Sequence, residues 1–206
     1  MLRLYDLARG ELLGPPVDVS VEDERREPVD RPAAVSLLAV NGRPAAVVLT
    51  GHQYTGERFL VGLWDLTDGS HLAWLEPAAS PAVATTIVAG RPVVITVGTG
   101  GTLRVWDAAG RQTPRTIPTG ADRIRFLAAG VLHGRPVVLA ASHDGPVTTW
   151  DLTTGTALDQ IRLPDTCRGI ALGERGVLVV AIQNDIAVIE TEIQGVVPDL
   201  GTPSEP

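Results

Sequence analysis

The stretch GTLRVWDAAG, residues 101–110, contains a glycine-led turn, a short apolar strand, a Trp-Asp pair and a second turn. Two other stretches have the same arrangement, FLVGLWDLTDG at 59–69 and GPVTTWDLTTG at 145–155. Short runs rich in Val, Thr, Leu and Trp between glycine turns are typical of β-strands. Their repetition predicts a protein assembled from copies of one small unit.

The Trp-Asp pairs recur at a nearly fixed period. The five copies are Tyr5-Asp6, Trp64-Asp65, Trp106-Asp107, Trp150-Asp151 and a degenerate Ile189-Glu190. Successive copies are 59, 42, 44 and 39 residues apart. A period of this length indicates a supersecondary unit that repeats along the chain.

A second marker sets the register of the unit. The segments NGRP, AGRP, HGRP and GERG each contain a glycine that precedes the next pair, at positions 42, 90, 134 and 173. The distances from these glycines to the first residue of the pair are 22, 16, 16 and 16 residues. The longer first distance places an insertion at 51–58, and a longer stretch before the first marker places another at 17–31. Both insertions combine glycine or proline with charged residues, which is typical of loops.

Each unit is predicted to contain four antiparallel strands. Within 123–161 the segments RIRFLAAGVL, PVVLAAS, VTTWDL and ALDQI are separated by turns. The second segment is apolar without alternation, which indicates a strand buried on both faces. Four-stranded sheets stacked face to face around an axis bury both faces, and this arrangement is a β-propeller.

The predicted fold class is therefore all-β, a propeller-like array of about four blades in an incomplete or shared ring. The array spans 1–193, and the proline-containing tail at 194–206 is expected to be disordered. The predicted parts are a half blade at 2–16, three full blades at about 33–76, 82–118 and 123–161, and part of a fourth blade at 167–190.

The pairs at 64–65, 106–107 and 150–151, the Asp144-Gly145 turn and the period resemble the WD-repeat β-propeller family. The resemblance covers roughly residues 2–193. It implies structural roles for the repeated residues, which are Trp64, Asp65, Trp106, Asp107, Trp150 and Asp151. Function does not follow from it, because one propeller fold serves many unrelated functions.

The family also has a structural hydrogen-bond network that joins a His, an Asp, a Ser or Thr and the Trp. In this sequence Ser142, Asp144 and Trp150 match most of that set. Gly120-Ala121 stands where Gly-His is expected, and the preceding repeat has Gly98 and Gly100 at the positions of Ser142 and Asp144. The blades are therefore expected to depend on apolar packing, with one partial polar network at most.

The blade count is lower than the seven or more that are common in this family, which leaves three interpretations. The chain is part of a longer propeller, or two copies close one ring, or a four-bladed ring closes within one chain. In the last two, the N-terminal strands complete the C-terminal blade. Strand sharing would remove the unpaired edges and apolar faces of an open blade.

Composition limits the partners. The chain has 206 residues, a net charge of −7 and a pI near 5.0, so nucleic acids and anionic membranes are not expected partners. A single cysteine, Cys167, excludes an internal disulfide, and no signal peptide is visible, so a cytoplasmic location is expected. The abundance of Ala, Gly and Pro suggests a GC-rich coding sequence, and the composition resembles that of bacterial proteins.

No residues with catalytic spacing stand out. The four histidines, at 52, 71, 133 and 143, lie in or near predicted turns without a metal-binding spacing. Cys167 has no histidine close in sequence and is expected to be a small buried side chain. VGTGGT at 97–102 lacks the Lys of a phosphate loop and precedes a strand, so it is a predicted hairpin turn. Neither a cofactor nor a metal is expected.

The favoured functional hypothesis is a non-catalytic protein-interaction scaffold, part of a larger propeller or assembly. Its partner is another protein, or a second copy that closes the ring. Long loops on rigid scaffolds often bind partners, so both insertions are candidates. Their candidate residues are Glu22, Arg25, Arg26, His52, Tyr54 and Arg58.

An enzyme of the quinoprotein oxidoreductase type is the alternative. WDLTDGSHLAW at 64–74 and WDLTTGTAL at 150–158 resemble the docking repeats of that family, Asp-x-x-Thr-Gly-x-x-x-Trp. Only the first segment has a Trp, Trp74, near the required place, whereas Leu158 stands there in the other. The resemblance implies pyrroloquinoline quinone with calcium and a periplasmic location.

Overall fold

The computed structural model of the chain is built almost entirely of β-strands. It describes residues 2–3, 5–6, 8–12, 16–19, 21–22, 28–29, 31–51, 58–110, 113–121, 123–173 and 176–190. The predicted tail at 194–206 lies outside these residues. A short 3-10 turn, Thr99–Gly101, lies within the VGTGGT segment that was predicted as a hairpin turn.

Three antiparallel sheets of four strands each form the centre of the molecule. The first contains β5 (Arg31–Val40), β6 (Arg43–Gly51), β7 (Phe59–Asp65) and β8 (His71–Ala78). The second contains β9 (Val83–Val88), β10 (Arg91–Val97), β11 (Thr102–Asp107) and β12 (Arg115–Pro118). The third contains β13 (Phe126–Leu132), β14 (Arg135–Ala141), β15 (Val147–Asp151) and β16 (Ala157–Ile161). We call these sheets blades 1, 2 and 3.

Smaller sheets flank the three blades. Blade 4 has three strands, β17 (Cys167–Leu172), β18 (Val177–Ile182) and β19 (Asp185–Glu190). At the other end β1 (Tyr5–Asp6) pairs with β2 (Glu11–Leu12), and β3 (Val21–Glu22) pairs with β4 (Pro28–Val29). The predicted insertion at 17–31 therefore contains a small hairpin.

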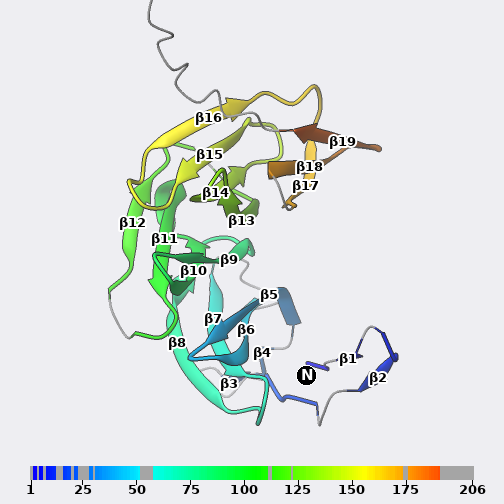
Figure 1. Ribbon diagram of the computed structural model, residues 1–206, viewed down its shortest axis with the longest axis vertical. Coiled ribbons are helices and arrows are strands. Elements are labelled where there is room, and N and C mark those ends of the chain that lie inside the picture. Colours follow the sequence, from blue (N-terminus) through cyan, green and yellow to red (C-terminus); the bar gives the residue numbers. More distant parts are fainter. Residues whose placement is uncertain are drawn as a thin grey trace, which may run out of the picture.

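The blades form an open arc (Figure 1). The first strands of successive blades contact one another, β5 with β9, β9 with β13 and β13 with β17, so they form the inner side of the arc. Among the described strands, β19 pairs only with β18 and β1 only with β2. The two ends lie apart, so closure of a four-bladed ring within one chain is not what this structure forms.

Apolar side chains fill the space between neighbouring blades. Val47, Leu49 and Leu63 of blade 1 form one cluster with Val94 and Trp106 of blade 2. A second cluster joins blades 2 and 3, and a third joins blades 3 and 4. The second strands make this packing possible on both faces of a blade, because β6, β10 and β14 each contain an uninterrupted run of buried residues.

The N-terminal segment packs on the face of blade 1 that points away from blade 2. Leu2 and Val17 form an antiparallel bridge, and their backbone N–H···O distances are 2.7 and 2.9 Å. Val17 and Val19 form a buried cluster with Ala46, Val48 and Trp64. The described residues between Leu2 and Val19 therefore lie where a preceding blade would pack, and the Leu2–Val17 bridge and the β1–β2 hairpin correspond to the outer strands of such a blade.

The Gly-Arg-Pro markers are the hairpin turns between the first and second strands. The turn residues Asn41 and Gly42 have φ values of 51° and 78°, and Ala89 and Gly90 have 49° and 77°. Two consecutive positive φ values define a type I′ turn, which matches the twist of paired strands. Asn tolerates the first position well, whereas Ala89 pays a steric cost there.

The Trp-Asp pairs end the third strands, and their Asp side chains hold the next turn. Asp65 Oδ1 accepts from the backbone N–H of Thr67 at 2.7 Å, and its Oδ2 lies 2.9 Å from the guanidinium of Arg43. Asp107 repeats this arrangement with Arg91, at 3.3 Å. In blades 1 and 2 the Arg of one marker thus pairs with the Asp of the other.

The strained Ala89 turn allows a stability prediction. Ala89→Asn is expected to raise the free energy of unfolding by about 0.5–1 kcal/mol, because Asn adopts a left-handed conformation at lower cost. Urea unfolding measures the change. Ala157→Asn is the control, because Ala157 is exposed in β16 without positive φ. An equal gain in both variants would contradict the explanation.

Candidate partner-binding face

Four hollows lined by described residues lie on one face of the array. We call it the crossover face, because it contains the crossovers between blades and the hairpins between second and third strands. The opposite face has the Gly-Arg-Pro turns and the turns that follow the Trp-Asp pairs. These are short, and backbone or Asp hydrogen bonds close them.

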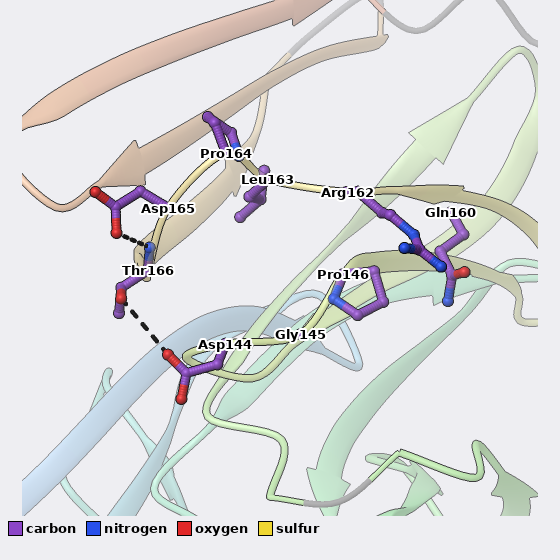
Figure 2. Close-up of a pocket in the computed structure, with 9 residues that line it drawn as sticks. All are labelled: Asp144, Gly145, Pro146, Gln160, Arg162, Leu163, Pro164, Asp165 and Thr166. Carbon is purple, nitrogen blue, oxygen red and sulfur yellow. Dashed lines mark hydrogen bonds between the residues drawn. The ribbon is translucent and has the colours of Figure 1, made fainter.

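One hollow on this face lies at the crossover from blade 3 to blade 4 and has a volume of about 470 Å³. Figure 2 shows its two walls, the β14–β15 hairpin with Asp144 and the crossover into β17 with Asp165 and Thr166. Asp165 accepts a hydrogen bond of 2.6 Å from the Thr166 backbone N–H, and Thr166 donates a long one of 3.5 Å to Asp144. Arg162 adds a positive charge.

A second hollow, of about 340 Å³, lies between blades 2 and 3. Its walls are the crossover at Thr119–Ala121, the β14 end with Ala140 and Ser142, and the ring of Trp150. Two more hollows of about 260 and 330 Å³ lie at the blade 2 hairpin. Together these hollows form a row along the crossover face.

Arg58 is the predicted loop residue that the structure places beside a hollow. It is exposed and lines the 330 Å³ hollow with Glu76 and Arg104. Arg104 forms an ion pair of 3.1 Å with Glu76 and donates at 3.3 Å to the carbonyl of Pro77. This hollow therefore combines two guanidinium groups with one carboxylate.

The other predicted loop residues are less completely placed. Glu22 belongs to β3, in the small hairpin of the first insertion. Arg25 and Arg26 of that insertion, and His52 and Tyr54 of the second, lie outside the described residues. Sequence reasoning missed the crossovers after β12 and β16, because single blades do not reveal the hollows between them.

The predicted polar network of Ser142, Asp144 and Trp150 is not formed. The Trp150 Nε1 group is buried and has no hydrogen-bond partner, and Asp144 contacts Thr166 instead. The equivalent bond exists one blade earlier, where Trp106 Nε1 donates to Thr96 Oγ1 at 3.1 Å. By strand register the position of Thr96 is occupied by Ala140 in blade 3, so Trp150 lacks its acceptor.

This difference between blades yields a reciprocal prediction. Thr96→Ala is expected to lower the free energy of unfolding by about 1–3 kcal/mol, because it leaves the Trp106 N–H unpaired. Ala140→Thr is expected to raise it by about 1 kcal/mol, since the new hydroxyl would lie beside Trp150 at the edge of a hollow. Urea unfolding measures both. Equal signs for the two changes would contradict the assignment.

The three described histidines have packing roles or lie in turns. His143 Nδ1 lies 3.1 Å from the carbonyl oxygen of Cys167, and its ring meets Phe126 edge-on at 5.4 Å. His71 contacts Trp64 and Trp74 at centroid distances of 5.3 and 4.4 Å. Burial lowers the pKa of His71, so its ring is neutral at pH 7. Within the described ranges no group of three or more His, Cys, Asp or Glu side chains could hold a metal ion.

Cys167 is fully buried between blades 3 and 4. Its Sγ lies 3.8 Å from the carbonyl oxygen of Gly169. Burial raises the pKa of the thiol, because the thiolate loses its hydration. The thiol is therefore protonated and unreactive at neutral pH.

This burial predicts the pH dependence of alkylation and stability. Iodoacetamide should modify Cys167 much more slowly in the native chain than in urea at pH 8. Because the folded pKa is above that of the unfolded thiol, the free energy of unfolding should fall as pH rises past about 8.5. Cys167→Ala should remove that part of the pH slope. Equal alkylation rates in both states would show that the thiol is accessible.

The fold defines the class of protein as an incomplete β-propeller. No protein-family model and no curated protein sequence matches the chain. Solved structures do match it, and one is the structure of U3-55K, a WD40 β-propeller protein, with a TM-score of 0.57 and 16% identity. The match covers 78% of this chain and 54% of that one, so the chain spans about half the length of U3-55K. Among the described residues no helix is long and apolar enough to cross a membrane.

Proposed function

We propose that the chain is a WD-repeat protein that acts as a non-catalytic protein-interaction scaffold in the cytoplasm. The observation that carries this proposal is the row of hollows along the crossover face. The walls of these hollows are strand ends and hairpins of the blades together with the crossovers between blades. A partner that reaches across the row would contact several blades at once.

The hollow at Arg58 is the proposed centre of binding. Arg is favoured at interface hot spots, and this one stands at the end of the long 51–58 insertion. The nearby Arg104–Glu76 pair, with side-chain exposures of 21% and 60%, offers charges of both signs. A partner that presents a carboxylate to Arg58 beside an apolar contact would fit this arrangement.

The test compares two charge reversals on opposite faces. Arg58→Glu changes the crossover face, and Arg135→Glu changes an exposed Gly-Arg-Pro turn on the other face. Affinity purification with each variant should retain a protein on the native chain and on Arg135→Glu and lose it on Arg58→Glu. Retention on all three, or loss with Arg135→Glu, would contradict binding at the crossover face.

A further inference from the structure

The first open end of the arc is a face built to receive another blade. On β5 the side chains of Val35 and Leu37 are 53% and 65% exposed. They lie seven and five residues before Gly42, and Val83 and Thr85 lie at the same distances before Gly90. Val83 packs on the cluster of blade 1, and Thr85 Oγ1 donates at 2.6 Å to the carbonyl of Leu37.

In blade 3 the two equivalent side chains are also covered by the preceding blade. Leu127 and Ala129 hold the same two positions before Gly134, and both pack on the cluster that contains Ile95 and Leu103 of blade 2. In blades 2 and 3 these positions are therefore covered by the preceding blade. On blade 1, Val17 and Val19 cover the middle of the face and leave its inner strand exposed.

The second open end has the complementary face. Ile186 of β19 is 66% exposed, and Val188 on the same side is 65% exposed. Ile186 lies four residues before Glu190. The residues four positions before the Asp of each Trp-Asp pair in blades 1, 2 and 3 are Val61, Leu103 and Val147, and they are 0%, 0% and 1% exposed. In the other blades this position is buried against the next blade, and in blade 4 nothing among the described residues covers it.

The two ends are thus the two halves of one interface. The chain already forms this interface between blades 1 and 2, 2 and 3, and 3 and 4. A surface that fits a different surface of the same molecule makes a head-to-tail contact, which closes into a ring when the rotation allows it. A second copy brings a matching blade to each end, so both faces are covered without any other protein.

Strand content supports the same occupant. Among the described residues β19 pairs only with β18, so its other edge has no partner there. The described N-terminal residues pair only with one another, Leu2 with Val17 and β1 with β2. A head-to-tail contact would bring the open edge of β19 in one copy close to the N-terminal strands of the other.

We infer that two copies of this chain associate head to tail, with the exposed face of blade 4 on the exposed face of blade 1. The complex is a closed ring with two equivalent junctions. Blades 1, 2 and 3 of each copy and two shared blades make about eight blades, which is within the usual range of propellers. The inference does not depend on the protein partner proposed above.

The test is the solution mass of the chain by light scattering. The native chain should show twice its 21.7 kDa mass over a range of concentrations. Leu37→Glu and Ile186→Glu should each show the mass of one chain. Ile87→Glu and Val131→Glu are matched controls, because these side chains are 60% and 54% exposed on inner strands of the central blades. Both controls should keep the doubled mass.

A mixing experiment establishes the orientation. Leu37→Glu keeps an intact blade 4 face, and Ile186→Glu keeps an intact blade 1 face, so an equimolar mixture should return to twice the chain mass. A mixture that stays monomeric would overturn the head-to-tail contact. A native chain that is monomeric throughout would overturn the second copy as occupant, and mass that grows without limit would overturn the closed ring. Far-UV circular dichroism and cooperative melting show that each variant is folded.

Discussion

Apolar contact between neighbouring sheets is the interaction on which this structure depends. The second strands of blades 1, 2 and 3 are buried on both sides, so none of these sheets is stable as a free-standing layer. Hydrogen bonds align strands within a blade, whereas the apolar clusters determine which blade lies beside which. Hydrogen-bonded turns, held by pairs such as Arg43 with Asp65, then fix the geometry at one face of the array.

Packing between the blades also buries polar groups, and each of these needs a hydrogen-bond partner within its own blade. Thr96 is the one polar residue of VVITV in β10, and it has an acceptor role because Trp106 lies within reach across the strand pair. Ala140 removes that acceptor from blade 3 and leaves a buried N–H beside a hollow. Packing holds the blade together in both cases, since Val138 and Leu139 remain buried in blade 3.

Sequence periodicity was sufficient to predict the all-β blades, because the spacing between glycine turns and Trp-Asp pairs is a local property. The hydrogen-bond network was predicted for the wrong blade. The resemblance to the WD-repeat family pointed to Ser142 and Asp144. The residue that accepts the hydrogen bond is Thr96, which the strand register places near Trp106. The small hairpin β3–β4 has two residues per strand, too few for a periodic pattern. The hollows depend on how separate blades meet, which no single repeat encodes.

Contacts between neighbouring blades also determine how such a chain can evolve. Each unit of roughly 40 residues meets only the units beside it, so the molecule has no central core that every part must fit. Duplication or loss of one unit in the gene would lengthen or shorten the array by one blade. The divergence between Thr96 in one copy and Ala140 in the next shows that copies can drift separately while their shared border survives.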